Sequence, residues 1–236
     1  MRKFERILVS GAMDSEILDL MEEVDEPQRV ELCGYSLVEG EIEDKTVAVL
    51  KTDIGMVNAA ASLAFAVAYF RPDLIINLGT AGAHNPQLHV GDVVVVASTD
   101  SINNQFGDDP ELFADPVLAS RAAAHFNRIL SSRLECEELG VPYPMTGYGP
   151  GKAMLGCMGS GDIWNKTKEA IDAVREEFGT DAEDMETYAA AHVAERAGVP
   201  FLGFRIMSNS EVLGEAYRPE TGAICQQLCL SLLETI

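Results

Sequence analysis

The chain has 236 residues, of which 47% are hydrophobic, and this composition is typical of a folded globular protein. Its length suits one α/β domain with a sizeable core. The formal net charge of −21 argues against contact with a nucleic-acid backbone, because such contacts depend on Lys and Arg.

The cysteines and the hydropathy of the chain indicate where in the cell the protein is expected. The five cysteines are odd in number and widely scattered, so the sequence predicts no disulfide framework. No run of 18 apolar residues predicts a membrane span, and no basic-then-apolar leader begins the chain. We therefore expect a cytoplasmic protein that binds neither nucleic acid nor membrane.

Short apolar strands alternate with helices along the chain. Strands are predicted at 6–10, 31–41, 45–51, 74–78, 91–99, 152–158 and 199–204. Helices are predicted at 16–21, 59–70, 116–130, 165–178, 187–197 and 222–233. The segments 100–116 and 131–151 are polar or rich in Pro and Gly, so we expect loops there. This alternation predicts one doubly wound α/β domain over 1–236, with a central mixed sheet flanked by helices.

Polar or small residues follow several of these strands. Arg205, Ser208 and Asn209 come after the strand at 199–204, and a Gly-Thr-Ala-Gly turn follows the strand at 74–78. Ligands of open α/β sheets bind outside the carboxyl ends of the strands. A single strand end of this kind is also expected where a strand simply runs into a surface loop. Here the pattern recurs at five strand ends, which favours a ligand site.

Three acidic or aromatic positions have two interpretations each. Glu16 either favours the dipole of the first helix, which Asp14 or Ser15 would cap, or acts chemically. The only tryptophan, Trp164, is either a core residue or a stacking platform beside a strand end. The carboxylates on either side of Met185 either favour a helix N-terminus or bind the hydroxyls of a diol such as ribose.

Eight short motifs in register extend over nearly the whole chain. They are SGAMDSE, IGMVNAA, LIINLGTAGAH, LHVGDVVV, SGDIW, EDMET, AHVAERAGVPF and FRIMSNSE. In this order they resemble the nucleoside phosphorylase/nucleosidase superfamily, and above all its 5′-methylthioadenosine/S-adenosylhomocysteine nucleosidases. The resemblance implies a mixed-sheet fold, a purine nucleoside as substrate, no cofactor or metal, a homodimer or dimer-based oligomer, and a place in methionine salvage.

The resemblance also implies roles for single residues. Glu16 matches the acid that activates the attacking water, and Glu186 matches the residue that takes the sugar hydroxyls. The remaining matches are positions that line or support the substrate pocket. They are Met13, Thr80, Ala81, Gly82, Trp164, which would stack on the purine, Met185, Arg205, a structural arginine, Ser208, and Phe106, which would come from a neighbouring subunit.

The nature of the nucleophile follows from the first loop. Phosphorylases of the superfamily carry arginine there to hold phosphate. In this chain the loop 11–16 has two acids and no arginine, and an acid repels phosphate. The sequence therefore favours hydrolysis over phosphorolysis by a purine nucleoside phosphorylase.

Asn209 departs from the nucleosidase pattern, which has Asp at this position to protonate the purine. An amide donates and accepts hydrogen bonds but delivers no proton. Two hypotheses follow. The enzyme prefers 6-oxopurine nucleosides such as inosine and guanosine, or it cleaves an adenine thioether nucleoside with a weaker acid, which typically costs roughly 10²–10⁴-fold in rate. A non-catalytic nucleoside-binding protein is the further alternative, and the pair Glu16 and Glu186 argues against it.

Overall fold

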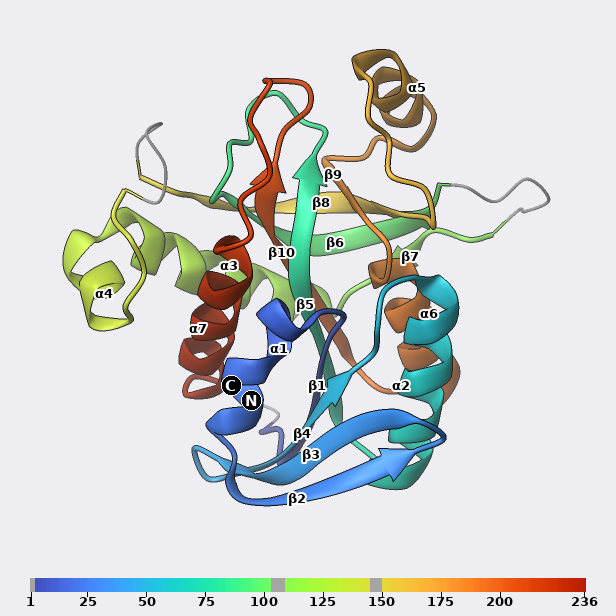
Figure 1. Ribbon diagram of the computed structural model, residues 1–236, viewed down its shortest axis with the longest axis vertical. Coiled ribbons are helices and arrows are strands. Elements are labelled where there is room, and N and C mark those ends of the chain that lie inside the picture. Colours follow the sequence, from blue (N-terminus) through green and yellow to red (C-terminus); the bar gives the residue numbers. More distant parts are fainter. Residues whose placement is uncertain (1–2, 103–108, 145–149) are drawn as a thin grey trace.

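The computed structural model describes residues 3–102, 109–144 and 150–236 (Figure 1). The strands are β1 Arg6–Gly11, β2 Asp25–Leu32, β3 Tyr35–Ile42, β4 Lys45–Lys51, β5 Leu74–Ala83, β6 Val93–Ser101, β7 Leu112–Phe113, β8 Ala153–Ser160, β9 Ala182–Asp184 and β10 Phe201–Asn209. The helices are α1 Asp14–Glu22, α2 Met56–Phe70, α3 Pro116–Ser131, α4 Arg133–Glu138, α5 Lys168–Phe178, α6 Thr187–Ala197 and α7 Thr221–Leu233. The predicted mixed α/β architecture is confirmed.

The sheet has a part that closes on itself. Its strand order is β10-β6-β8-β9-β5-β1-β4-β3-β2, and β10 also pairs with β5. The strands β5, β10, β6, β8 and β9 therefore form a ring, and β1, β4, β3 and β2 extend from it. β1 pairs in parallel with β4 and β5, and β5 pairs in parallel with β10, so their carboxyl ends meet at one edge. The sequence does not predict the ring.

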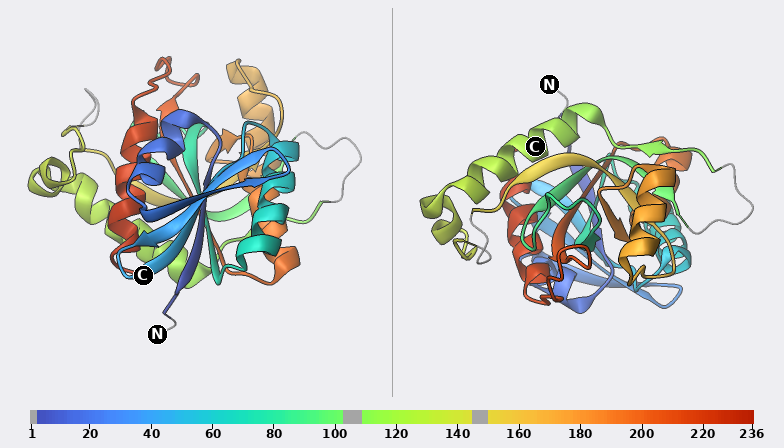
Figure 2. Two further views of the ribbon diagram at one scale, coloured as in Figure 1. Left: turned by 60° about the horizontal axis from the view of Figure 1, so that its bottom comes forward. Right: turned by 90° about the horizontal axis from the view of Figure 1, so that it is seen from above.

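Helices cover the sheet from opposite sides (Figure 1). α1 packs against α7 on one side, and α2 packs against α6 on the other. α3 packs across β6 and β8, and in the right view of Figure 2 its yellow-green helix runs along the outer side of the yellow strand β8. α2 and α6 are rich in alanine, and these small side chains allow the two helices to approach closely.

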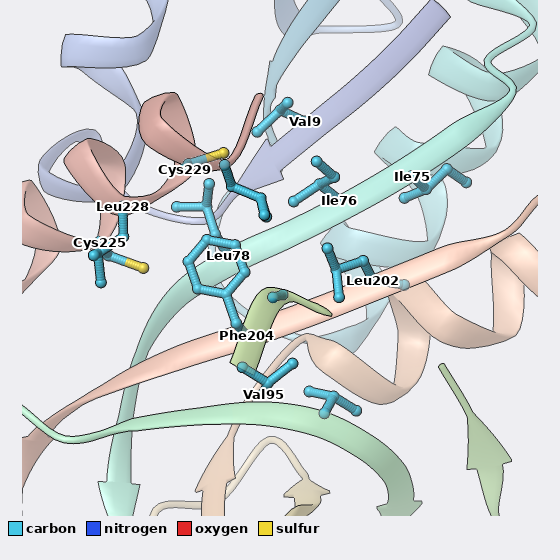
Figure 3. Packing of buried hydrophobic residues seen from close by; sticks show 14 of the residues in the cluster. Val9, Ile75, Ile76, Leu78, Val95, Leu202, Phe204, Cys225, Leu228 and Cys229 are labelled. Atoms are coloured by element: carbon cyan, nitrogen blue, oxygen red, sulfur yellow. The ribbon is translucent and has the colours of Figure 1, made fainter. Parts of the chain in front are cut away.

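The core lies where α7 meets the parallel strands (Figure 3). Apolar side chains from β1, β5, β6 and β10 interleave there with Cys225, Leu228 and Cys229 of α7, and all are buried. Each such side chain contributes about 1.5–3 kcal/mol when it leaves water. All five cysteines are free in the structure, and Cys136, Cys225 and Cys229 are buried.

One predicted strand is in fact two. The segment 31–41 was predicted as a single strand, but β2 ends at Leu32 and β3 begins at Tyr35. Cys33 and Gly34 between them have φ of 52° and 91°, the left-handed backbone of a tight turn. β2 begins well before the predicted strand, in a charged, proline-containing segment that lacks an apolar pattern.

Two other strands are longer at their carboxyl ends than predicted. β5 continues from Leu78 to Ala83, and β10 continues from Phe204 to Asn209. The small turn residues and the polar group of the sequence are thus on strands, where neighbouring strands fix their backbone. This difference matters because a strand holds a side chain more rigidly than a loop does.

The two predicted loops contain short elements. α4 lies within 131–151, and β7 within 100–116, while residues 103–108 and 145–149 lie outside the described residues. Among the helices of the described ranges, none is both long and apolar enough to span a bilayer.

Candidate functional site

A cavity of about 270 Å³ opens at the carboxyl ends of β1, β5 and β10. Residues from seven parts of the chain surround it. They are Ala12, Met13, Glu16, Ile54, Thr80, Ala81, Gly82, Ile163, Trp164, Glu183, Asp184, Met185, Glu186, Ser208, Asn209 and Tyr217. Four of these are carboxylates and none is a lysine or arginine, so the cavity has a strongly negative lining.

The Glu16 carboxylate is fixed by four hydrogen bonds. Its Oε1 accepts from the backbone N and the Oγ1 of Thr80, at 2.8 and 2.9 Å. Its Oε2 accepts from the backbone N of Ala12 and of Met13, at 3.2 and 3.1 Å. Glu16 is only 3% exposed. These donors hold a buried acceptor in one orientation at the cavity wall.

The start of α1 explains this geometry. Met13 is the N-cap residue, and Glu16, three residues later, bonds back to it in a capping box. The prediction that Asp14 or Ser15 caps the helix is wrong, and Asp14 instead pairs with Lys51 at 2.6 Å. Gly79 leaves room for the acid, since a Cβ there would lie 3.0 Å from Glu16 Oε1.

Hydrogen bonds from α7 hold α1 in place. Gln226 of α7 is buried, its Oε1 accepts from Leu20 N at 3.1 Å, and its Nε2 donates to Ser15 O at 2.9 Å. A Cβ on Gly222 would lie 2.5 Å from Ser15 O, so the two helices are in direct contact. The position of Glu16 therefore depends on α7.

Asp184 and Glu186 have different environments although both line the cavity. Asp184 pairs with Arg205 at 2.8 Å and accepts from Ser160 Oγ at 2.5 Å. Glu186 is the N-cap residue of α6, and its Oε1 accepts from Gly55 N at 2.8 Å, at the start of α2.

The pKa of Glu186 is raised from its ordinary value to about 8, chiefly by burial and also by repulsion from Asp184 and Glu16. Arg205 and the Gly55 N–H oppose this rise. Glu186 therefore ionises less readily than an ordinary glutamate.

The other end of the cavity is more open. Trp164 is 45% exposed and follows β8 on the segment that leads to α5, with Ile163 beside it. Asn209 at the end of β10 is buried, and its Oδ1 lies 3.1 Å from Ser208 Oγ. Tyr217 comes from the segment between β10 and α7, and burial raises the pKa of its phenol.

Most predicted site residues gather in this single cavity. Ten of them line it, namely Met13, Glu16, Thr80, Ala81, Gly82, Trp164, Met185, Glu186, Ser208 and Asn209. Arg205 does not line it; the side chain is buried behind the wall, donating to Asn77 and Asp184. Phe106 lies outside the described residues.

Six lining residues were not predicted as site residues. Asp184 was considered only with Glu186, as a carboxylate pair beside Met185, and Glu183 only as part of an acidic run. Ala12, Ile54 and Ile163 stand in the motifs SGAMDSE, IGMVNAA and SGDIW, which were the available signal for them. Tyr217 lies in a segment without periodicity, and nothing in the sequence distinguishes it.

One group of potential metal ligands lies apart from the cavity in the described part of the chain. Ligand atoms of Asp100, Glu111 and Cys157 lie within 4.8 Å of one another. Burial raises the pKa of the Cys157 thiol to about 12, which keeps the sulfur protonated and makes it a poor ligand.

Comparisons with known proteins agree with this geometry. The family model described as Phosphorylase superfamily matches residues 6–234. A 5′-methylthioadenosine/S-adenosylhomocysteine nucleosidase of Bacillus pumilus is 31% identical over 218 residues, covering 86% of this chain and 85% of the relative.

Two solved structures share the fold. The nucleosidase of the same name from Colwellia psychrerythraea, in complex with adenine, has a TM-score of 0.82 at 24% identity, covering 98% of this chain and 95% of that one. The enzyme from Neisseria meningitidis, in complex with methylthio-immucillin-A, has a TM-score of 0.81 at 23% identity, covering 98% and 100%.

Proposed function

The chain belongs to the phosphorylase superfamily, and we propose that it acts there as a nucleosidase, an N-glycosidase that hydrolyses the bond between a purine and its ribose. The observation that carries this proposal is a cavity lined by four carboxylates and by no cation among the described residues. Such a lining repels phosphate and accepts water. The relatives that match the chain are named nucleosidases, which agrees with this choice.

Glu16 is the proposed general base. Its four donors orient the carboxylate, and a water beside it is placed to attack the anomeric carbon. A bond forms between the water oxygen and C1′ while the bond from C1′ to N9 of the purine breaks. The proton of the water passes to Glu16. The electron pair of the broken bond moves onto the purine, which takes a proton from solvent as it leaves.

Glu186 and Met185 are proposed to hold the sugar. The Glu186 carboxyl group lies at the same cavity wall as Glu16 and accepts bonds from the 2′- and 3′-hydroxyl groups. Met185 packs on the sugar face. Because the transition state resembles an oxocarbenium ion, the carboxylates around the ring also stabilise its positive charge.

Arg205 is proposed to act by positioning. Its guanidinium group is buried and pairs with Asp184, whose Oδ1 accepts from the backbone N of Glu186 at 3.3 Å. It thus fixes the segment that carries Met185 and Glu186.

Trp164 is proposed to stack on the purine, and Asn209 to bond to the purine edge. Both line the end of the cavity that is away from Glu16's loop, with Thr80, Ala81 and Gly82 forming the floor between the two ends. Small floor residues let a flat ring lie close to the backbone.

The test follows free base and reducing sugar released from inosine, guanosine, methylthioadenosine and adenosylhomocysteine, with and without phosphate. We expect equal release of base and free ribosyl sugar in phosphate-free buffer. A strict phosphate requirement would identify a phosphorylase instead. Tight binding without turnover of any nucleoside would identify a binding protein.

Self-association is proposed from the outer face of α2. Val57, Phe65 and Tyr69 are exposed and are spaced eight and four residues apart, which places them on one face of the helix, with exposed Ile54 just before them. Exposed apolar patches of this kind mark protein–protein contacts. We expect a homodimer in sedimentation equilibrium, and Val57→Glu to shift the mass to that of a monomer.

The cytoplasm is the proposed location. Five free cysteines, three of them fully buried in the core, suit a reducing compartment.

A further inference from the structure

Helix α2 begins without a capping side chain of its own. Its N-cap residue is Gly55, which has no side chain, and no residue of its first turn is acidic. The first backbone N–H groups of a helix need acceptors, and the positive end of its dipole attracts negative charge. Acceptors and negative charge must therefore come from other parts of the chain.

Two carboxylates from distant segments supply these acceptors. Glu186 Oε1 accepts from Gly55 N at 2.8 Å, and Asp162 Oδ1 accepts from Met56 N at 2.9 Å. The two donors are consecutive along the backbone, although their acceptors lie 131 and 106 residues away in the sequence. The start of α2 therefore connects the segment that carries Glu186 to the segment between β8 and α5.

The backbone at Gly55 is suited to this double contact. Its φ is 101°, a value that residues with a side chain rarely adopt. A Cβ on Gly55 would lie 3.0 Å from Asp162 Oδ1. Ile54, directly before this glycine, lines the cavity. The contact between Asp162 and α2 is thus close, and it lies beside the cavity.

Trp164 lies between two anchors of its own segment. On one side Asp162 is bonded to α2, and on the other Asn165 donates from its backbone N to Glu183 of β9, at 2.8 Å. Lys166 Nζ lies 5.1 Å from the centroid of the Trp164 ring, but it belongs to the same segment and moves with the ring. The position of the ring relative to the rest of the cavity therefore depends on the two anchors.

We propose that Asp162 is a positioning residue of the site, and this rests on the proposed nucleosidase function. By accepting from Met56 N, Asp162 attaches the segment of Trp164 to the helix whose preceding N–H holds Glu186. The ring that stacks on the purine and the carboxyl group that takes the sugar hydroxyls are thereby held at one distance from each other. Asp162 is not among the residues that line the cavity, so it acts through Trp164.

The first measurement needs no ligand. Trp164 is the only tryptophan of the chain, so quenching of tryptophan fluorescence by acrylamide reports the accessibility of this ring alone. Asp162→Ala should increase quenching and lower the fluorescence anisotropy, because the segment loses one anchor. Loss of one capping hydrogen bond should raise the population of the loosened segment roughly three- to tenfold. Unchanged quenching and anisotropy would overturn the proposal.

Three further substitutions separate positioning from a general loss of stability. Asp162→Asn keeps an oxygen that accepts from Met56 N, so it should restore most of the wild-type signal. Met56→Pro removes the donor instead, and proline is tolerated at the first position of a helix. It should give the same signal as Asp162→Ala. Asp172→Ala, which removes an exposed carboxylate of α5, is the control and should behave as wild type.

The variants also test whether the hydrogen bond itself is the cause. Because Asp162→Ala and Met56→Pro remove the same bond, their effects should not add in the double variant. Additive effects, or equal signals from Asp162→Asn and Asp162→Ala, would overturn the proposal. Melting temperatures show whether each variant is folded, and Met56→Pro provides the same test if Asp162→Ala does not fold.

Turnover gives the second readout and keeps the two proposals distinct. With the nucleoside that is cleaved fastest, Asp162→Ala should raise KM roughly three- to tenfold and leave kcat nearly unchanged, because the bond from Gly55 N to Glu186 remains. A fall in kcat at unchanged KM would show that Asp162 acts through Glu186, and this would overturn the proposal. Absence of turnover of any nucleoside would remove the proposed function, while the fluorescence of the ligand-free protein would still decide whether Asp162 positions Trp164.

Discussion

The two ends of the cavity are built differently. At the end proposed to hold sugar and water, Glu16 accepts four hydrogen bonds, three of them from backbone N–H groups. At the end proposed to hold the base, Trp164 is nearly half exposed, and Asn209 Nδ2 has one weak bond. The proposed general base is thus fixed by the backbone, whereas the residues proposed to recognise the base are presented at a strand end and on a connecting segment. We therefore expect the reaction to be harder to change by substitution than the choice of base.

The largest effect is expected from Glu16→Gln. Removing the general base should lower kcat by roughly a thousand-fold while ligand affinity changes little. Asp14→Asn, a neighbouring exposed acid paired with Lys51, is the matched control and should stay active. Steady-state kinetics measures kcat, and calorimetry measures ligand affinity. Near-normal turnover of the Gln variant would contradict the assignment of the reacting atoms to the end of the cavity with Glu16.

A smaller effect is expected from Glu186→Gln, through the pH dependence of stability. The unfolded chain loses this proton near the ordinary pKa of 4.5, but the folded chain keeps it until about 8. The carboxyl therefore contributes stability that is fully present below pH 4.5 and is lost as pH rises to about 8. Relative to the Gln variant, wild type should lose about 3 kcal/mol between pH 5.5 and 8.5.

Urea unfolding at the two pH values measures this difference. Glu195→Gln, on the exposed surface of the same helix, is the control and should follow wild type. An identical pH dependence for wild type and Glu186→Gln would contradict the raised pKa.

Trp164→Ala should weaken binding of a purine base by roughly ten- to a hundred-fold, since stacking is worth about 1–3 kcal/mol per base. Trp164→Phe should retain most of the affinity. Because each change removes the fluorophore, calorimetry is the measurement. If both variants bind as wild type does, the base does not stack there.

The smallest effects are expected from alanine substitutions of two glycines of β5, and these two substitutions compare the two ends of the cavity directly. A Cβ on Gly79 would lie 3.0 Å from Glu16 Oε1, whereas a Cβ on Gly82 would meet nothing nearer than Asn209 Nδ2 at 3.4 Å. Gly79→Ala should displace the general base and lower kcat about tenfold. Gly82→Ala should raise KM with little change in kcat, because its methyl group enters the space over the floor. If Gly79→Ala raised KM and Gly82→Ala lowered kcat, the sugar and the base would have to be assigned to the opposite ends of the cavity.

Much of the fold could be predicted from the sequence, because hydrophobic periodicity marks most of its strands and helices. β1, β4, α3, α6 and α7 lie within a residue or so of their predicted bounds. β2 was mostly missed because Asp25–Gln28 is charged and contains a proline, and it forms a strand only by pairing with β3. The closed ring depends on the pairing of β10 with β5, which no local pattern specifies.

The site was predictable to the extent that strand ends gather at one edge of a parallel sheet. That rule places Thr80 near Asn209 without any structure. It does not place Glu183, because the side that β9 takes beside β5 is fixed by an antiparallel register of two residues. Nor does it separate Arg205 from Asn209, because strict alternation along β10 would put both side chains on one face, and the register of β10 against β5 shifts between Met207 and Asn209.

The fastening of α1 by α7 has a consequence for protein synthesis. Ser15 and Leu20 are translated some two hundred residues before Gln226, so the two bonds that Gln226 makes to α1 form only after α7 has been made. Until α7 docks, the helix that carries the proposed general base lacks this support.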